Sequence, residues 1–92
     1  MEFKINYSEN SLKLSGQLTE NNIQLFKLVT YKYLTKCDKL TLDINNVTCV
    51  DKLGVKSIIA LYKHSLRHHK DILFFGNGAR DIIEELHHKN IA

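Results

Sequence analysis

The sequence predicts an α/β domain in which three helices cover one face of a four-stranded mixed sheet. Short β-rich runs alternate with segments of helical periodicity, and their order along the chain is β-β-α-β-α-β-α. Strands separated by a single helix are parallel neighbours joined by right-handed crossovers, whereas the first two strands lie close enough in sequence to form a hairpin. A chain of 92 residues fits one such domain, which we expect to span residues 1–92.

The first two strands and the first helix are predicted from residues 3 to 36. Segments 3–7 and 12–14 alternate apolar and polar residues, turn formers lie between them, and Gly16 ends the second arm of the hairpin. Thr19 offers an N-cap for a helix that runs to about Lys36. The apolar positions of this helix recur at helical spacing: Ile23, Phe26, Val29 or Thr30, and Tyr33.

The middle of the chain predicts a buried strand followed by a second helix. Residues 40–44 are β-rich, the polar pair Asn45-Asn46 marks a turn, and apolar residues resume at 47–50. Asp51 can cap the helix that follows. The apolar positions of this second helix share one face: Val55, Ile58, Ile59, Tyr62 and Leu66.

A fourth strand and a third helix complete the predicted domain. Residues 72–75 form a continuous apolar run typical of an interior strand, and a turn at 76–78 leads into the last helix. The apolar residues of that helix are Ile82, Ile83 and Leu86. We expect the hydrophobic core to include Phe26, Leu42, Ile44, Val55, Ile59, Tyr62, Leu73 and Phe75.

Composition and charge exclude several classes of protein. The net charge is +3, and the 13 basic and 10 acidic residues are interspersed, so no basic tract points to nucleic acid. The N-terminus lacks a signal-peptide pattern, and the longest apolar stretch, residues 58–62, is far too short to span a bilayer. Cys37 and Cys49 lack C-x-x-C spacing, which indicates reduced thiols. We therefore expect a cytoplasmic protein that does not insert directly into the membrane.

Candidate sites for chemistry are few. No constellation of catalytic residues is present, so we expect neither an enzyme nor a cofactor. The turn from Gly76 to Gly78 can present backbone N–H groups to a nucleotide or another small anion, but G-x-G alone favours a simple strand-to-helix turn. His64 and His68 lie on one side of the second helix, but two imidazoles do not make a metal site and we assign no metal.

The outward face of the second helix is predicted to be partly apolar. Leu53, Ala60 and Leu61 fall, with Ser57 and His64, away from the inward stripe. An exposed and partly apolar helix face indicates docking. Leu61 lies at the margin of this face, where sideways packing on a neighbouring helix is an equally good interpretation, whereas Leu53 in the first turn is harder to bury.

Three short motifs occur in a fixed order along the chain. They are Leu14-Ser-Gly16-Gln-Leu18 after the hairpin, Leu42-Asp43-Ile44-Asn-Asn-Val47, and Val50-Asp51-Lys-Leu-Gly54-Val55. Together they resemble the STAS domain, which is shared by anti-sigma factor antagonists, sulfate transporter tails and the small STAS subunit of Mla-type phospholipid-transport ABC systems. The resemblance covers residues 3–91 and implies a non-catalytic protein-interaction module.

The resemblance also implies where a partner binds. In the STAS family the D-x-x-G loop and the helix after it contact the partner, and anti-sigma factor antagonists carry a phosphorylatable Ser or Thr just before the glycine. Leu53 occupies that position here and Lys52 replaces the other usual hydroxyl residue, so neither side chain has an oxygen to accept phosphate. The expected partner-binding residues are Asp51, Lys52, Leu53, Gly54, Ser57, Ala60, Leu61 and His64.

Two partner classes follow from the resemblance. The short chain is similar to the small Mla-type subunit, which docks on and regulates the transporter ATPase at the inner face of the cell membrane, although the Mla-type loop usually reads D-T-G-G. The alternative is an anti-sigma factor antagonist, or a related signalling module, that has lost its phosphorylatable Ser or Thr. Such a protein would bind an anti-sigma factor or a kinase-like protein.

Overall fold

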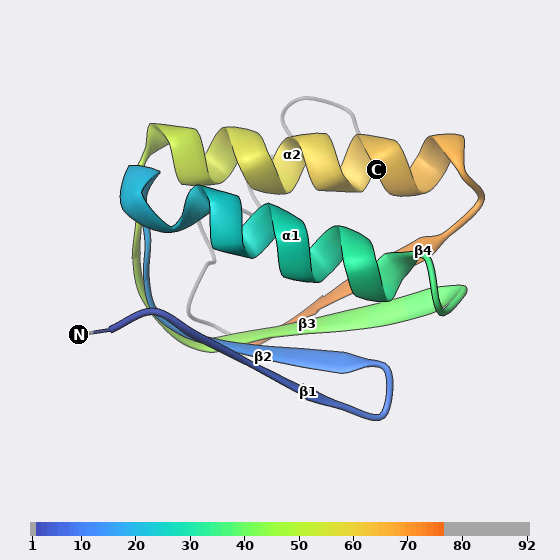
Figure 1. The fold of residues 1–92 in the computed structure, drawn as a ribbon, viewed down its shortest axis with the longest axis horizontal. Coiled ribbons are helices and arrows are strands. Elements are labelled where there is room, and N and C mark those ends of the chain that lie inside the picture. The colour runs from blue at the N-terminus through green and yellow to red at the C-terminus, as the bar shows by residue number, and fades with distance from the viewer. Residues whose placement is uncertain (1, 77–92) are drawn as a thin grey trace.

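The computed structural model describes residues 2–76, which form four strands, two α-helices and one 3₁₀ turn (Figure 1). In chain order these are β1 (Lys4–Ser8), β2 (Ser11–Leu18), η1 (Glu20–Asn22), α1 (Ile23–Leu34), β3 (Lys39–Val50), α2 (Lys52–Arg67) and β4 (Asp71–Phe75). The predicted third helix, with Ile82, Ile83 and Leu86, and the Gly78 end of the preceding turn lie outside the described residues.

The sheet has the predicted mixed topology. The strand order is β1-β2-β3-β4, with β1 antiparallel to β2, and β3 parallel to both β2 and β4. Helices α1 and α2 lie side by side on one face of this sheet, as Figure 1 shows. The four-stranded mixed sheet with helices on one face is therefore confirmed for the described part of the chain.

The hairpin turns at Glu9 and Asn10, whose φ angles of 45° and 64° are the left-handed values that a two-residue type I′ turn requires. Its second arm does not end at Gly16, as predicted, but continues to Leu18. Gly16 has a φ of +92°, and a Cβ there would lie 2.6 Å from the Glu2 carbonyl oxygen. The glycine is thus needed inside the strand, where the N-terminal segment passes close to it.

The tip of the hairpin is fastened to the end of α1 by aromatic packing. Tyr7 of β1 stacks on Tyr33 of α1, with ring centroids 4.0 Å apart and an interplanar angle of 10°. The Lys32 and Lys36 ammonium groups each lie 5.6 Å from the centre of the Tyr33 ring. Helix α1 ends at Leu34, one residue after Tyr33, and not at about Lys36 as predicted.

Strand β3 is continuous over 12 residues, so the turn predicted at Asn45-Asn46 is wrong. Between the pairs Lys13↔Asp43 and Ser15↔Asn46, β3 contains one residue more than β2, which is a β-bulge. The Asn45 backbone N–H donates to the Asp43 carboxylate across 3.0 Å at this point. The extra residue resets the alternation, and for this reason Ile44 and Val47 are both buried.

The hydrophobic core fills the space between the sheet and the two helices. Of the predicted core residues, Phe26, Leu42, Ile44 and Ile59 are buried, and Val55 and Tyr62 are partly buried against them. The prediction was wrong for Leu73 and Phe75, which are 59% and 58% exposed. β4 alternates, with Ile72 and Phe74 turned to the core and these two side chains turned to the opposite sheet face, where no described helix packs.

Candidate docking surface

Asp51 stands at the junction between β3 and α2 and holds the starts of both helical segments. One carboxylate oxygen accepts the Gly54 backbone N–H at 2.8 Å, which confirms the predicted helix cap. The other oxygen accepts the Glu20 backbone N–H of η1 at 2.9 Å. The Gly54 hydrogen bond, followed by the Glu20 hydrogen bond, lowers the pKa of this carboxyl below its usual value.

Thr19 was predicted to cap the first helix, but its side chain makes no capping hydrogen bond. The chain enters α1 through η1, and Asn22 at the α1 N-cap position also lacks a side-chain cap. Two other hydrogen bonds anchor this entry turn: the Glu20 backbone N–H donates to the Asp51 carboxylate across 31 positions in the sequence, and the Asn22 side-chain amide donates to the Gln17 carbonyl oxygen at 2.7 Å. The Asp51 carboxylate thus links the N-terminal ends of the two helical segments.

Gly54 is required by close packing. A Cβ at this buried position would lie 2.4 Å from the Leu18 carbonyl oxygen and 2.7 Å from Cγ1 of Val50. No side chain fits there without a backbone shift. Asp51 and Gly54 thus fix the first turn of α2, in which the two intervening residues, Lys52 and Leu53, have exposed side chains.

The buried face of α2 is rotated by one residue from the predicted stripe. Its centre runs through Gly54, Ile58, Leu61 and Ser65, all of which are buried. Leu61 is fully buried, so its predicted outward orientation is wrong, and Leu66 from the predicted stripe is 51% exposed. The rotation follows from Gly54, because the absence of a side chain lets this face approach β2 most closely.

Ser57 was also predicted to face outward, but it is only 5% exposed. Its hydroxyl donates to the Leu53 carbonyl oxygen one turn earlier, at 2.9 Å. Ala60 is exposed and His64 is half-buried, while Leu53 is 43% exposed. Of the residues expected to bind a partner, the structure leaves Lys52, Leu53 and Ala60 exposed and places Gly54, Ser57 and Leu61 inside.

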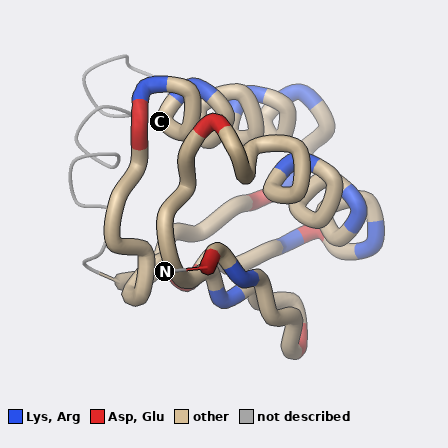
Figure 2. The backbone as a smooth tube through the Cα atoms, turned by 60° about the vertical axis from the view of Figure 1, so that its left-hand side comes forward, with Lys and Arg blue, Asp and Glu red and all other residues tan. Residues whose placement is uncertain are grey.

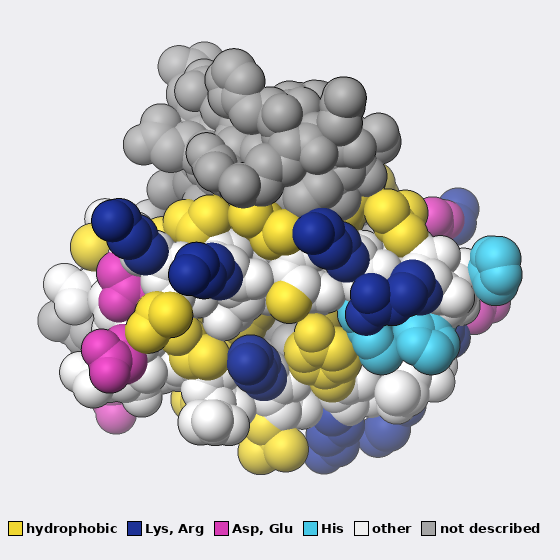
Figure 3. Space-filling model, turned by 90° about the horizontal axis from the view of Figure 1, so that it is seen from above, with side chains coloured by type: hydrophobic (Ala, Val, Ile, Leu, Met, Phe, Trp, Pro, Cys, Tyr) yellow, Lys and Arg dark blue, Asp and Glu magenta, His cyan; other side chains and the backbone are white. Residues whose placement is uncertain are grey.

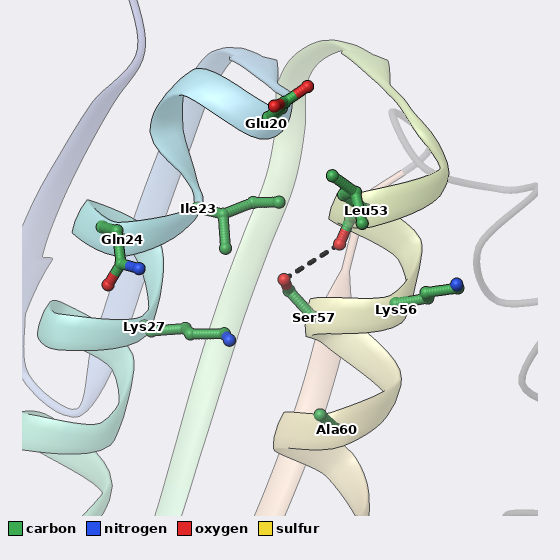
Figure 4. Close-up of a pocket in the computed structure, with 8 residues that line it drawn as sticks. All are labelled: Glu20, Ile23, Gln24, Lys27, Leu53, Lys56, Ser57 and Ala60. Atoms are coloured by element: carbon green, nitrogen blue, oxygen red, sulfur yellow. Dashed lines mark hydrogen bonds between the residues drawn. The ribbon is translucent and has the colours of Figure 1, made fainter.

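A shallow groove of about 380 Å³ lies between the N-terminal halves of the two helices (Figure 4). Its lining is formed by Glu20, Ile23, Gln24, Lys27, Leu53, Lys56, Ser57 and Ala60. In Figure 4, Ile23 and Leu53 approach from opposite sides, Lys27 extends toward α2, and Lys56 points outward. The sequence did not predict the α1 side of this groove, since Ile23, Gln24 and Lys27 belong to no local motif.

His64 lies farther along the seam between the helices. Its ring makes an edge contact with Tyr31 of α1 at 4.8 Å and lies 4.2 Å from the His68 ring. Burial, followed by the proximity of His68 and Arg67, lowers the pKa of His64 from its usual value. Burial also raises the pKa of Tyr31, and Arg67 opposes this rise.

Among residues 2–76, no group of three or more His, Cys, Asp or Glu side chains is placed to hold a metal ion. Neither of the two described α-helices is long and apolar enough to cross a membrane.

Known structures share this architecture. An anti-sigma factor antagonist from Mycobacterium paratuberculosis superposes with a TM-score of 0.68, over 98% of this chain and 78% of that one, at 13% identity. The anti-sigma factor antagonist SpoIIAA in its unphosphorylated form gives 0.67, over 90% of this chain and 82% of its own, at 8% identity. This chain has the STAS fold. The fold implied by the sequence resemblance is therefore confirmed.

The STAS fold also occurs within a larger protein. The structure of Mglu matches with a TM-score of 0.66 at 10% identity, over 83% of this chain but only 20% of the Mglu chain. No protein-family model and no curated protein sequence matches this chain. The similarity therefore concerns the fold alone.

Proposed function

We propose that this STAS domain is a non-catalytic interaction module that docks on a partner protein through Lys52, Leu53 and the adjoining groove. The observation that carries the proposal is the 43% exposure of Leu53 in the first turn of α2, whose position is set by Asp51 and Gly54. An apolar side chain held in a fixed position at the surface loses little conformational freedom when a partner covers it. This makes Leu53 a suitable anchor.

The partner that we propose is the ATPase subunit of a Mla-type phospholipid-transport ABC system, which the STAS domain would regulate from the cytoplasmic side of the membrane. The sequence resemblance supports this partner, and so does the absence of a phosphorylatable hydroxyl at position 53. Ser57 does not replace that hydroxyl, because it is buried and donates to the Leu53 carbonyl oxygen. Docking that is not switched by phosphate at this loop suits a permanent subunit.

The second candidate is an anti-sigma factor antagonist, or a related signalling module, that has lost its phosphorylation site. The observation in its favour is the similarity to two structures described as anti-sigma factor antagonists. In this case the domain would bind an anti-sigma factor or a kinase-like protein, and phosphate at position 53 would not release it.

Affinity capture with two matched variants tests the proposal. Leu53→Glu places a carboxylate at the groove, whereas Leu66→Glu places one at a similarly exposed leucine on the last turn of the same helix. We expect both variants to fold, because both leucines are exposed, and circular dichroism would check this. The captured proteins are identified by mass spectrometry, so an ABC-transporter ATPase and an anti-sigma factor or kinase-like protein are told apart directly.

The expected result is that Leu66→Glu retains the partner and Leu53→Glu loses at least about tenfold in affinity, since burying an unpaired carboxylate is costly. Full retention by the folded Leu53→Glu variant would move the interface elsewhere, with Leu25 and Leu28 of α1, 45% and 71% exposed, as the next candidates. Unfolding of Leu53→Glu alone would instead show that Leu53 contributes to the core.

A further inference from the structure

The two helices that border the groove carry only positive charge. The two helices contain six cationic side chains and no Asp or Glu. The cations are Lys27 and Lys32 of α1, and Lys52, Lys56, Lys63 and Arg67 of α2. All six side chains are exposed. Figure 2 shows the same separation along the backbone, where the acidic positions lie at the helix starts and in the sheet layer.

The described acidic side chains do not pair with these cations. The ion pair found within residues 2–76 joins Lys70 to Asp38 at 3.2 Å, and none of the six helix cations pairs with an acidic side chain in the described chain. Lys52 occupies the first position of α2, where the helix dipole disfavours a positive charge. Within residues 2–76, no acidic side chain neutralises the charge on this face.

Apolar side chains lie between these cations. Ile23, Leu53 and Ala60 line the groove, with Lys27 on the α1 side and Lys56 on the α2 side. Seen from above in Figure 3, hydrophobic side chains of the helix layer are interspersed with Lys and Arg. Glu20 is the acidic member of the lining and lies at the end of the groove near the helix starts.

We infer that the groove between α1 and α2 accepts an acidic amphipathic segment of the partner protein. Apolar side chains of that segment would enter between Ile23 and Leu53, and its carboxylates would meet Lys27 between the helices and Lys56 on the outer rim of α2. Glu20 repels carboxylates at its own end, so the acidic residues of the segment lie toward Ala60. A groove admits a protruding side chain, which a flat lipid headgroup surface does not offer, and this favours a protein segment over an anionic membrane.

This inference rests on the proposed function, because it specifies the chemistry of the partner that docks beside Leu53. The probe is a display library of random peptides, selected on the folded wild-type protein and counter-selected on Leu53→Glu. We expect the enriched peptides to combine apolar anchors with a net negative charge. The tightest peptide is then synthesised, labelled and titrated by fluorescence anisotropy at low and high salt.

Charge-reversed variants test the assigned contacts. The pair Lys27→Glu with Lys56→Glu should weaken the peptide about tenfold, because two attractions become repulsions. The matched pair Lys4→Glu with Lys13→Glu changes net charge equally on exposed strand residues outside the groove and should leave affinity within about twofold. Glu20→Gln should strengthen binding about twofold to fivefold, and added salt should weaken it.

Three outcomes would overturn the inference. Enrichment of neutral or basic peptides would leave Leu53 as a docking anchor but reject an acidic partner. An equal loss of peptide affinity in both charge-reversed pairs would show that binding depends on the net charge of the protein and not on the groove. Recovery of no peptide that distinguishes the wild type from Leu53→Glu would reject both the inference and the proposed docking site, and binding to phosphatidylglycerol vesicles in that case would assign the face to a membrane.

Discussion

The two faces of α2 each carry a leucine, yet only one of those leucines is in the core. The inner face consists of Gly54, Ile58, Leu61 and Ser65, and the outer face includes Leu53, Lys56, Ala60 and Lys63. The inner face carries no charged side chain, yet its centre also contains a glycine and a serine. A Cβ at Gly54 would lie 2.4 Å from the Leu18 carbonyl oxygen, so close backbone approach at this glycine contributes, with the apolar pattern, to placing Leu61 rather than Leu53 in the core.

Replacing the buried leucine should have the largest effect on stability. Leu61→Ala is expected to lower the free energy of unfolding by about 2–5 kcal/mol, because the side chain is fully buried and leaves a cavity. Leu66→Ala, at a position that is 51% exposed, should change it by less than about 0.5 kcal/mol. Urea denaturation followed by circular dichroism measures both values. Similar losses in the two variants would contradict the assignment of the inner face.

Gly54→Ala tests the cause of the rotation. Alanine normally stabilises a helix interior relative to glycine by about 1 kcal/mol. Here we expect the opposite sign, with a loss of about 1–3 kcal/mol, because the new Cβ would lie 2.4 Å from the Leu18 carbonyl oxygen. A stabilised Gly54→Ala protein in the same urea experiment would show that α2 does not depend on this approach.

Removal of the carboxylate at Asp51 should have an intermediate effect. Asp51→Ala loses the hydrogen bonds to Gly54 and Glu20, and we expect thermal denaturation to show a Tm lowered by about 4–8 °C. Asp51→Asn keeps one acceptor oxygen and should lose less. If the two variants melted at the wild-type temperature, the carboxylate would not hold the helix starts.

The lowered pKa of Asp51 also gives this contribution a defined pH window. The folded state favours the ionised carboxyl, so the contribution is fully present above the usual value of 3.8 and is lost as the pH falls through the lowered folded value. The difference in Tm between the wild type and Asp51→Ala should therefore shrink below about pH 4. A difference that stays constant into stronger acid would reject this origin.

The smallest expected effect concerns His64 on the seam between the helices. The pKa of His64 is lowered in the folded protein, so the imidazole is protonated in the unfolded chain first as the pH falls below the usual histidine pKa of 6.5. Wild-type stability should fall slightly from pH 7 to pH 5, and this component should be absent from His64→Gln. The measurement is the urea midpoint of each protein at both pH values. Identical pH responses of the two proteins would contradict it.

The fold was predictable because strand and helix periods are local properties of the sequence. The hairpin, the three described parallel or antiparallel pairings and the Asp51 cap all follow from short motifs. The predictions were wrong where one local sequence pattern is compatible with two different structures. Asn45-Asn46 has the composition of a turn, but Asn45 lies in a bulge and Asn46 pairs with Ser15. The run at 72–75 has the composition of an interior strand, but its side chains alternate between the two sheet faces.

The candidate site was predictable only in part, for a different reason. Leu53 could be identified because it lies between Asp51 and Gly54, two residues of one short motif. The α1 side of the groove could not, because Ile23 and Lys27 reach it through a parallel crossover that brings distant segments together. The burial of Leu61 depends on the approach of Gly54 to Leu18. This contact joins two different elements, so the helical period of α2 alone does not predict it.

The stacked rings of Tyr7 and Tyr33 give this protein an optical signal of its own. The chain contains four tyrosines and no tryptophan, so near-ultraviolet dichroism in the tyrosine band is not masked by indole. Two nearly parallel rings with centroids 4.0 Å apart are held in a fixed asymmetric setting only while the hairpin tip packs on α1. During denaturation, loss of the tyrosine band before the far-ultraviolet signal would show that the hairpin detaches while the helices persist. The variant Tyr7→Leu, which lacks the stacked pair, is the control.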